Sequence, residues 1–175
     1  GIAFPASPTA GQLFFRTDTT QLYTYANSKW QADRTTATKI VAASDSANKE
    51  KADYVCDGVD DEVEINAAIS ALPSTGGLVY LLEGTYTVGA TVTLNKSNVT
   101  FSGAGASTII KVKNSTSINA ITLSGTRTGI HLTNLTIDGN KANQTDGLDA
   151  SNQDGIVCRT NENCVVSRST FDHLW

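Results

Sequence analysis

The sequence predicts an all-β fold in which one α-helix covers the end of a stack of parallel strands. A single apolar stripe at helical spacing predicts the helix: Ile65, Ala68, Ile69 and Leu72. After Leu78 the chain changes to short runs of Val, Ile, Leu and Thr, separated by Gly, Asn and Ser, with no helical period. Because an uncovered sheet end recruits other chains, we expect the helix to close that end.

The predicted helix has a defined beginning and end. We expect Asp61 to be its N-cap, with Glu64 returning the hydrogen bond three residues on and favouring the positive end of the helix. Pro73, followed by Gly76 and Gly77, stops the helix. A buried strand then begins.

A repeat runs through the part predicted to be β. Three mutually similar segments place Phe101, Ile137 and Phe171 in register, at intervals of 36 and 34 residues. Other short apolar runs lie between these positions, so each coil supplies about three strands, as a triangular parallel solenoid requires. Asn98 and Asn134 occupy equivalent positions in this repeat, and we expect their side chains to stack at the corners of the coils.

The segment 57–88 resembles the start of right-handed parallel β-helix proteins of the pectate-lyase-like group. The resemblance is carried by an Asp-Gly-x-x-Asp-Asp turn, an Ile-Asn-Ala-Ala-Ile helix, a Gly-Gly break, a Val-Tyr-Leu strand and Gly-Thr-Tyr: Asp57, Gly58, Asp60, Asp61, 65–69, Gly76, Gly77, 79–81 and 84–86. It implies a helix-capped, right-handed parallel β-helix domain over residues 34–175. The chemistry stays open, because lyases, hydrolases, epimerases and non-catalytic adhesins share this fold.

Residues 1–33 are predicted to form a separate connector module. Two strands, 11–16 and 21–25, make a hairpin, and a turn at 27–29 precedes the last aromatic residue of the module. So small a hairpin is marginal in water and must dock on something. Its predicted apolar face consists of Leu13, Phe15, Tyr23, Tyr25 and Trp30.

The pattern Pro-x-x-Gly-x-x-Phe-x-x-Thr-x-x-x-x-Leu-Tyr-x-Tyr-x-x-x-x-Trp, from Pro8 to Trp30, resembles small modules of bacteriophage tail fibres and tailspikes. In those proteins the modules connect the shaft or baseplate to the body. The resemblance implies that residues 1–33 contact other tail or baseplate proteins. Because β-helix tailspikes are generally homotrimers, it also implies a homotrimer. A generic N-terminal hairpin on a secreted enzyme is the alternative.

Composition narrows the function classes further. The net charge is −4 and Lys and Arg do not cluster, which argues against a nucleic-acid partner. No apolar run approaches the roughly 18 residues of a membrane span. Cys56, Cys158 and Cys164 fit no zinc-site spacing, and we expect buried thiols, with a Cys158–Cys164 bridge as the alternative. A start at Gly1 and the lack of Met suggest a piece of a longer protein.

Candidate catalytic residues are the acids at the ends of predicted strands: Asp138, Asp154, Asp172 and the neighbouring His173. Glycoside hydrolysis needs two carboxyl groups, and a histidine beside an acid is placed to move a proton.

The long polar segment between Asp138 and Gly155 is expected to leave the body as a loop, with residues 140–153 projecting. Asp146 and Asp149 in this loop are candidate ligands for Ca²⁺, which prefers such oxygens. Solvated turn residues are the alternative, because the spacing does not match a twelve-residue calcium loop. We expect no other cofactor.

Together these features predict a virion tail attachment protein whose β-helix body binds cell-surface polysaccharide. No known catalytic signature of β-helix enzymes is present, so we expect no activity of this chain, while a depolymerase activity of a longer protein stays open. A secreted polysaccharide lyase or glycoside hydrolase of the pectate-lyase-like group, in the extracellular space, is one alternative. A non-catalytic cell-surface or filament protein is another.

Overall fold

The computed structural model describes residues 3–17, 21–26, 28–32, 38–144, 154–158 and 162–174. This part of the chain is mostly β, with parallel sheets and a single α-helix, α1 (Glu62–Ser70). Two short 3-10 helices, η1 (Lys49–Lys51) and η2 (Lys141–Asn143), lie in connections. The chain divides into two compact units, Gly1–Thr36 and Ala37–Trp175.

The first unit is a three-stranded antiparallel sheet. Its strands follow one another in the order β1 (Leu13–Arg16), β2 (Gln21–Ala26) and β3 (Lys29–Ala32). The predicted hairpin corresponds to β1 and β2. The structure adds β3, which pairs with β2 and places Trp30 opposite Tyr25.

Aromatic side chains hold one face of this small sheet together. Phe4 stacks on Trp30 with ring centroids 5.2 Å apart, and Phe14 and Tyr25 lie 5.8 Å and 5.4 Å from the same ring. The predicted face was wrong in part, because Leu13 is 60% exposed. Side chains alternate along a strand, and the packing of Phe4 selects the face of Phe14, which is opposite to that of Leu13.

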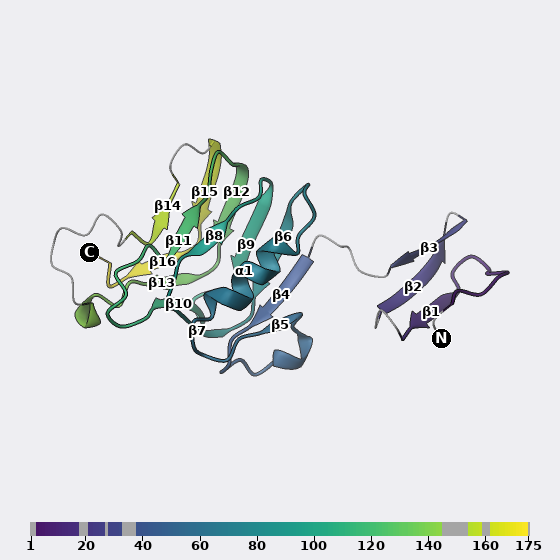
Figure 1. The fold of residues 1–175 in the computed structure, drawn as a ribbon, viewed down its shortest axis with the longest axis horizontal. Coiled ribbons are helices and arrows are strands. Elements are labelled where there is room, and N and C mark those ends of the chain that lie inside the picture. The colour runs from purple at the N-terminus through teal and green to yellow at the C-terminus, as the bar shows by residue number, and fades with distance from the viewer. Residues whose placement is uncertain are drawn as a thin grey trace. The chain divides into compact units, whose positions relative to one another are not determined.

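Three parallel sheets make up the second unit, and from β6 onward each takes every third strand (Figure 1). The β7 sheet contains β7 (Gly84–Val88), β10 (Thr108–Val112), β13 (Thr136–Asp138) and β16 (Thr170–Asp172). The β8 sheet contains β8 (Val92–Leu94), β11 (Ile121–Leu123) and β14 (Ile156–Val157). The β9 sheet contains β5 (Tyr54–Val55), β4 (Thr38–Ala42), β6 (Gly77–Leu81), β9 (Val99–Gly103), β12 (Thr128–Thr133) and β15 (Glu162–Ser167). We name one passage of the chain through all three sheets a circuit.

The inward side chains of the three sheets form one buried core. Side chains alternate along each strand, so every second residue points inward. Aligned inward positions stack from circuit to circuit, as in the rows Val79–Phe101–Leu132 and Tyr86–Ile110–Ile137.

The register of the repeat differs from the predicted one. Phe101 aligns with Leu132 in the β9 sheet, whereas Ile137 aligns with Phe171 in the β7 sheet. The predicted alignment of Phe101 with Ile137 is therefore wrong, and that of Ile137 with Phe171 is correct. The error arises because only two residues separate β12 from β13, and the end of β12 (Leu-Thr) resembles the start of β13 (Thr-Ile).

Left-handed backbone conformations recur at the corners between sheets. One corner, where the chain enters the β9 sheet, has positive φ at four aligned positions: Gly76, Asn98, Gly129 and Asn163. Gly and Asn adopt this conformation at little cost, and a Cβ at Gly76 would lie 2.2 Å from the Asn98 carbonyl oxygen. Asn134 lies at a different corner, between β12 and β13, where it aligns with Arg168. The predicted equivalence of Asn98 and Asn134 is therefore wrong.

Helix α1 covers the first edge of the sheets. It packs against β4, β5, β7 and β8, which lie at that edge (Figure 1). The predicted apolar stripe is confirmed as buried: Ile65, Ala68 and Ile69 in the helix, and Leu72 just after it. The helix therefore closes the apolar core on this side.

Polar side chains complete the same edge. Within the described residues, β7 and β8 are the terminal strands of their sheets, so every second backbone N–H along them needs an acceptor from elsewhere. Four side chains accept these hydrogen bonds at 2.7–2.9 Å: Asp45 from Thr85, Asp61 from Thr87, Glu62 from Gly89 and Asn66 from Thr93. We name Asp45, Asp61, Glu62 and Asn66 the edge acceptors.

Asp61 precedes the helix as predicted, but the predicted capping box is wrong. Its side chain makes no capping hydrogen bond to α1. Instead Oδ1 accepts from the Gly58 N–H at 2.8 Å, and Oδ2 accepts from the Thr87 N–H at 2.7 Å. Asp61 is fully buried with helical backbone angles, whereas an N-cap residue is usually extended. Its carboxylate therefore accepts hydrogen bonds from the sheet and from the preceding turn. Glu64 does not form a capping box with Asp61.

Burial raises the pKa of the Asp61 carboxyl. The N–H donors of Thr87 and Gly58 lower it, but they do not cancel the effect of burial. Asp61 is thus a desolvated carboxyl group whose two oxygens satisfy buried backbone donors at this edge.

We predict that Asp61→Asn destabilises the protein by about 1–3 kcal/mol, the cost of one unsatisfied buried polar group. Asparagine has the same shape, but it places an amide nitrogen against either the Gly58 or the Thr87 N–H. Urea unfolding followed by circular dichroism would measure the loss. Asp57→Asn is the matched control, because Asp57 is exposed and its oxygen accepts from the Val59 N–H, which Asn can also do. Equal unfolding midpoints for the two variants would contradict the edge role of Asp61.

Candidate functional site

The outward face of the β7 sheet carries a row of polar side chains. Tyr86, Ile110 and Ile137 point inward, so the residues that follow them point outward. The parallel register stacks these outward residues one above another: Thr87, Lys111, Asp138 and Asp172. One strand from each circuit therefore contributes one polar group to a common face.

An open groove of about 520 Å³ lies along this face at β7 and β10. It is lined by Thr85, Thr87, Lys111, Val112, Lys113, Asn114 and Asn140. Six of the seven lining residues carry a hydroxyl, ammonium or amide group, so the groove offers hydrogen-bond donors and acceptors beside the apolar parts of the same side chains.

Three of the four candidate catalytic residues meet beyond Lys111 on the same face. The Nδ1 atom of His173 lies 3.1 Å from Asp138 Oδ1 and 3.4 Å from Asp172 Oδ2. Lys111 Nζ lies 3.8 Å from the other oxygen of Asp138. Asp138 is the most enclosed of these side chains, at 17% exposure, whereas His173 is 61% exposed. The cluster combines two carboxylates, an imidazole and an ammonium group.

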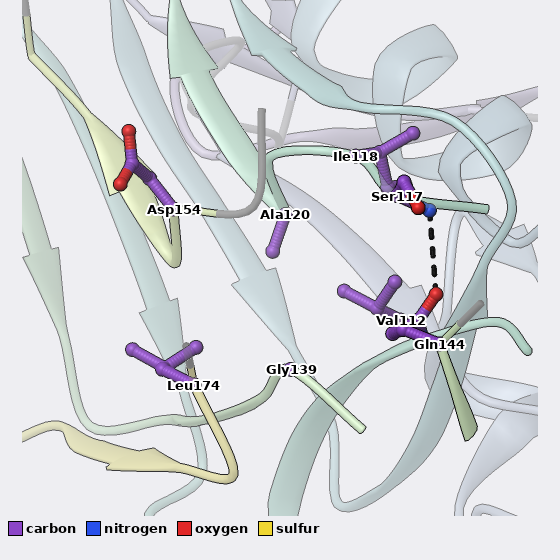
Figure 2. Close-up of a pocket in the computed structure, with 8 residues that line it drawn as sticks. All are labelled: Val112, Ser117, Ile118, Ala120, Gly139, Gln144, Asp154 and Leu174. Atoms are coloured by element: carbon purple, nitrogen blue, oxygen red, sulfur yellow. Dashed lines mark hydrogen bonds between the residues drawn. The ribbon is translucent and has the colours of Figure 1, made fainter. Parts of the chain in front are cut away.

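The fourth candidate, Asp154, lies elsewhere, on the wall of a cavity of about 10 Å³ (Figure 2). Its backbone N–H donates to Asn119 Oδ1 at 2.9 Å. The buried Ser117 Oγ in the same wall has no hydrogen-bond partner among the described residues. A volume of this size admits about one water molecule, so this cavity is no ligand site.

The floor of the groove is fixed by Asn140. This residue is 6% exposed and has a left-handed backbone, with φ of 52°. Its Nδ2 donates to the Val112 carbonyl oxygen at 2.9 Å and to Asn114 Oδ1 at 2.8 Å, and its Oδ1 accepts from Asn143 at 2.7 Å. These bonds hold the connection after β13 against the end of β10.

The predicted projection of residues 140–153 is therefore wrong at its start. Residues 140–144 pack on the body, because Gln144 Oε1 accepts from the Ser117 N–H (Figure 2) and from the Thr116 N–H. The Nε2 atom of Gln144 donates to the Lys113 carbonyl oxygen. Residues 145–153 lie outside the described part of the chain, and with them the candidate calcium ligands Asp146 and Asp149.

Lys113 connects the groove to the turn that precedes α1. Its Nζ donates to Asp60 Oδ1 at 2.7 Å, and this hydrogen bond raises the pKa of the lysine. Asp60 has a left-handed backbone, with φ of 55°. One end of the groove is thus positioned by the residues that cover the first edge.

A group of possible metal-binding residues lies inside the body, formed by Cys56, Asp61 and Glu64. Both oxygens of Asp61 already accept backbone hydrogen bonds. Burial, followed by the surrounding carboxylates, raises the pKa of the Cys56 thiol. Through Asp61, this group forms part of the structure that closes the first edge.

Sequence reasoning missed Lys111, Lys113 and Asn140 as site residues. The two lysines alternate with buried Ile110 and Val112, which marks them as outward-facing residues of a strand. That signal identifies their face. It does not show that Asp138 and Asp172 follow on the same face, because this depends on the register between circuits.

No protein-family model matches the chain, and no curated protein sequence matches it. Among solved structures, ORF18 of Geobacillus virus E2 is similar to this chain, with a TM-score of 0.49 and 25% sequence identity. The match covers 77% of this chain and 31% of that one, so this chain spans less than a third of that protein. No helix in the described residues is long and apolar enough to cross a membrane.

We predict that Asn140→Ala destabilises the protein by about 2–4 kcal/mol, because it leaves the Val112 carbonyl without its partner and puts a Cβ-bearing residue with no side-chain hydrogen bond in a left-handed conformation. Asn140→Gly should lose less, since glycine removes the backbone part of the cost. Asn95→Ala, at an exposed position outside the hydrogen bonds of Asn140, is the control. Thermal melts would rank the variants. A melting temperature for Asn140→Ala equal to that of Asn95→Ala would contradict the assigned role.

Proposed function

We propose that this chain is part of a virion tail attachment protein that binds cell-surface polysaccharide along the groove of the β7 sheet. The groove is the single observation that carries the proposal. It is open, and its lining is rich in hydroxyl, ammonium and amide groups. Sugar hydroxyls pair with donors and acceptors of these kinds. An open groove also admits a polymer from either end, which an enclosed pocket does not.

The proposal includes a right-handed parallel β-helix as the body. The regular order of strands through three parallel sheets supports it, and so does the helix over their first edge. Stacked circuits place one residue from each strand along a line. Successive sugars of a polymer can then meet successive rungs of the same face.

Residues 1–33 are proposed to attach the body to other tail or baseplate proteins, within a homotrimer. The support is the sequence pattern that ends at Trp30, together with the separate compact unit that these residues belong to. Phe4, Phe14 and Trp30 pack together in that unit.

We predict that Lys111→Ala weakens polysaccharide binding about tenfold or more, the loss expected for a charge-assisted hydrogen bond. Binding to a panel of immobilised bacterial surface polysaccharides would be measured by biolayer interferometry. Lys51→Ala is the matched control, because Lys51 is an exposed lysine of η1 outside the groove. If Lys111→Ala kept full affinity, the polysaccharide would have to bind outside the groove. Failure of the wild-type chain to bind any member of a host-matched panel would contradict the proposed function.

A second candidate function is polysaccharide cleavage, and the contacts of His173 favour it. Asp138 and Asp172 both approach its Nδ1 atom, so two carboxyl groups lie near one point of the face. Glycoside hydrolases use such a pair, one as acid and the other as base or nucleophile. Against cleavage, the sequence carries no known catalytic signature of β-helix enzymes, and Asp172 is 56% exposed to water.

We therefore predict no measurable cleavage by this chain in reducing-sugar and unsaturated-uronate assays over bacterial capsule and plant polysaccharides. Asp138→Asn and Asp172→Asn are the informative variants, and Asp154→Asn is the control because Asp154 lies at a different cavity. If the wild-type chain cleaved a polysaccharide, and if both informative variants lost this activity while the control kept it, the protein would be an enzyme and the attachment proposal would be wrong.

A further inference from the structure

Two of the three cysteines meet in the last described circuit, although they belong to different sheets. Cys158 directly follows β14 of the β8 sheet, and Cys164 lies in β15 of the β9 sheet. Both are free thiols, and their Sγ atoms are 2.7 Å apart. Both side chains are partly buried against the core. A bond between them therefore requires little movement of either strand.

The surroundings of the pair are less well covered than the earlier circuits. Val166 and Phe171 align with Leu132 and Ile137, which are completely buried. In the last circuit the same inward positions are 39% and 44% exposed. A covalent link between strands of two sheets would restrain their separation in this circuit.

We propose that Cys158 and Cys164 form an intramolecular disulfide in an oxidising environment, and that this bond fixes the β8 sheet to the β9 sheet in the last circuit. The inference is independent of the proposed function. It makes the pair a redox-controlled crosslink and assigns the two thiols a role beyond packing.

The bond forms by thiol–disulfide exchange with a small-molecule disulfide such as oxidised glutathione. The thiolate of one cysteine attacks the oxidant and releases one glutathione. The thiolate of the second cysteine attacks the mixed disulfide and releases the other. The two cysteine thiols lose two electrons and two protons, and one glutathione disulfide becomes two glutathione thiols.

The third cysteine does not compete for this reaction. Cys56 is 2% exposed at the first edge, where its Sγ lies 3.8 Å from the Asp61 carbonyl oxygen.

Burial, followed by the neighbouring Cys164, raises the pKa of the Cys158 thiol to about 12. Exchange is therefore slow near neutral pH and accelerates as the pH rises, because the thiolate is the nucleophile.

The first test is a thiol count on the whole chain after incubation with oxidised glutathione at mildly alkaline pH. Titration in denaturant should find the three thiols of the sequence before oxidation and a single one afterwards. The mass should fall by about 2 Da, with no glutathione adduct, and non-reducing electrophoresis should show no crosslinked dimer. Peptide mapping should join Cys158 to Cys164. Cys56→Ser should behave in the same way, apart from its missing thiol. In Cys158→Ser, Cys164 should instead carry a glutathione adduct or remain a free thiol.

The second test is a pair of thermal melts on the oxidised and the reduced protein. Oxidation should raise the melting temperature by about 3 °C or more, and a reductant should reverse the rise. Cys158→Ser should show no such difference. Three titratable thiols after oxidation, a persistent glutathione adduct or an intermolecular dimer would each overturn the proposed bond. A bond that forms without changing the melting temperature would overturn its role as a crosslink.

Discussion

Backbone donors at the first edge of the sheets impose the constraint on which the rest of the second unit depends. Strands β7 and β8 begin two of the three sheets, and the N–H groups on their outer side need acceptors. The edge acceptors supply them, and two of the four, Glu62 and Asn66, lie within α1. The helix is therefore fixed in two ways, by its apolar stripe on the core and by polar bonds to strand edges. Burial alone would let a short helix slide or rotate, whereas bonds at defined positions set its register.

This fixed first edge positions the groove. Thr87 lies in the row of polar residues on the outer face, and its backbone is bonded to Asp61. Lys113 is bonded to Asp60, in the turn that leads into the helix. Asn140, another lining residue, ties the connection after β13 to the end of β10. Four lining residues lie in β7 and β10, and Lys113, Asn114 and Asn140 are fixed by side-chain hydrogen bonds, which suits recognition without large rearrangement.

The sequence was sufficient for some elements of the fold and insufficient for others. Ile65, Ile69 and Leu72 could be placed in the core because a helical stripe needs only local spacing. Alignment between circuits is not local. Phe101 is 31 positions from its partner Leu132, whereas Leu132 is 34 positions from Val166, so no fixed interval identifies the register.

For the candidate site, too, the sequence predicted single residues but not which of them lie together. Asp138, Asp172 and His173 could be selected from the sequence because they follow apolar strand residues. Their meeting with Lys111 depends on parallel alignment across circuits and could not be predicted. The role of Asp61 was misassigned for a related reason. An acid before a helix fits a capping box by local rules, while its actual partner, Thr87, lies 26 residues on.

The bonded first edge also bears on association between molecules. A strand from another molecule that approaches β7 or β8 finds the outer donors already bonded to the edge acceptors and the core covered by α1. An incoming strand would have to displace these side chains before it could pair with either strand. The acids that hold the helix in place thus also protect β7 and β8 against edge-to-edge aggregation.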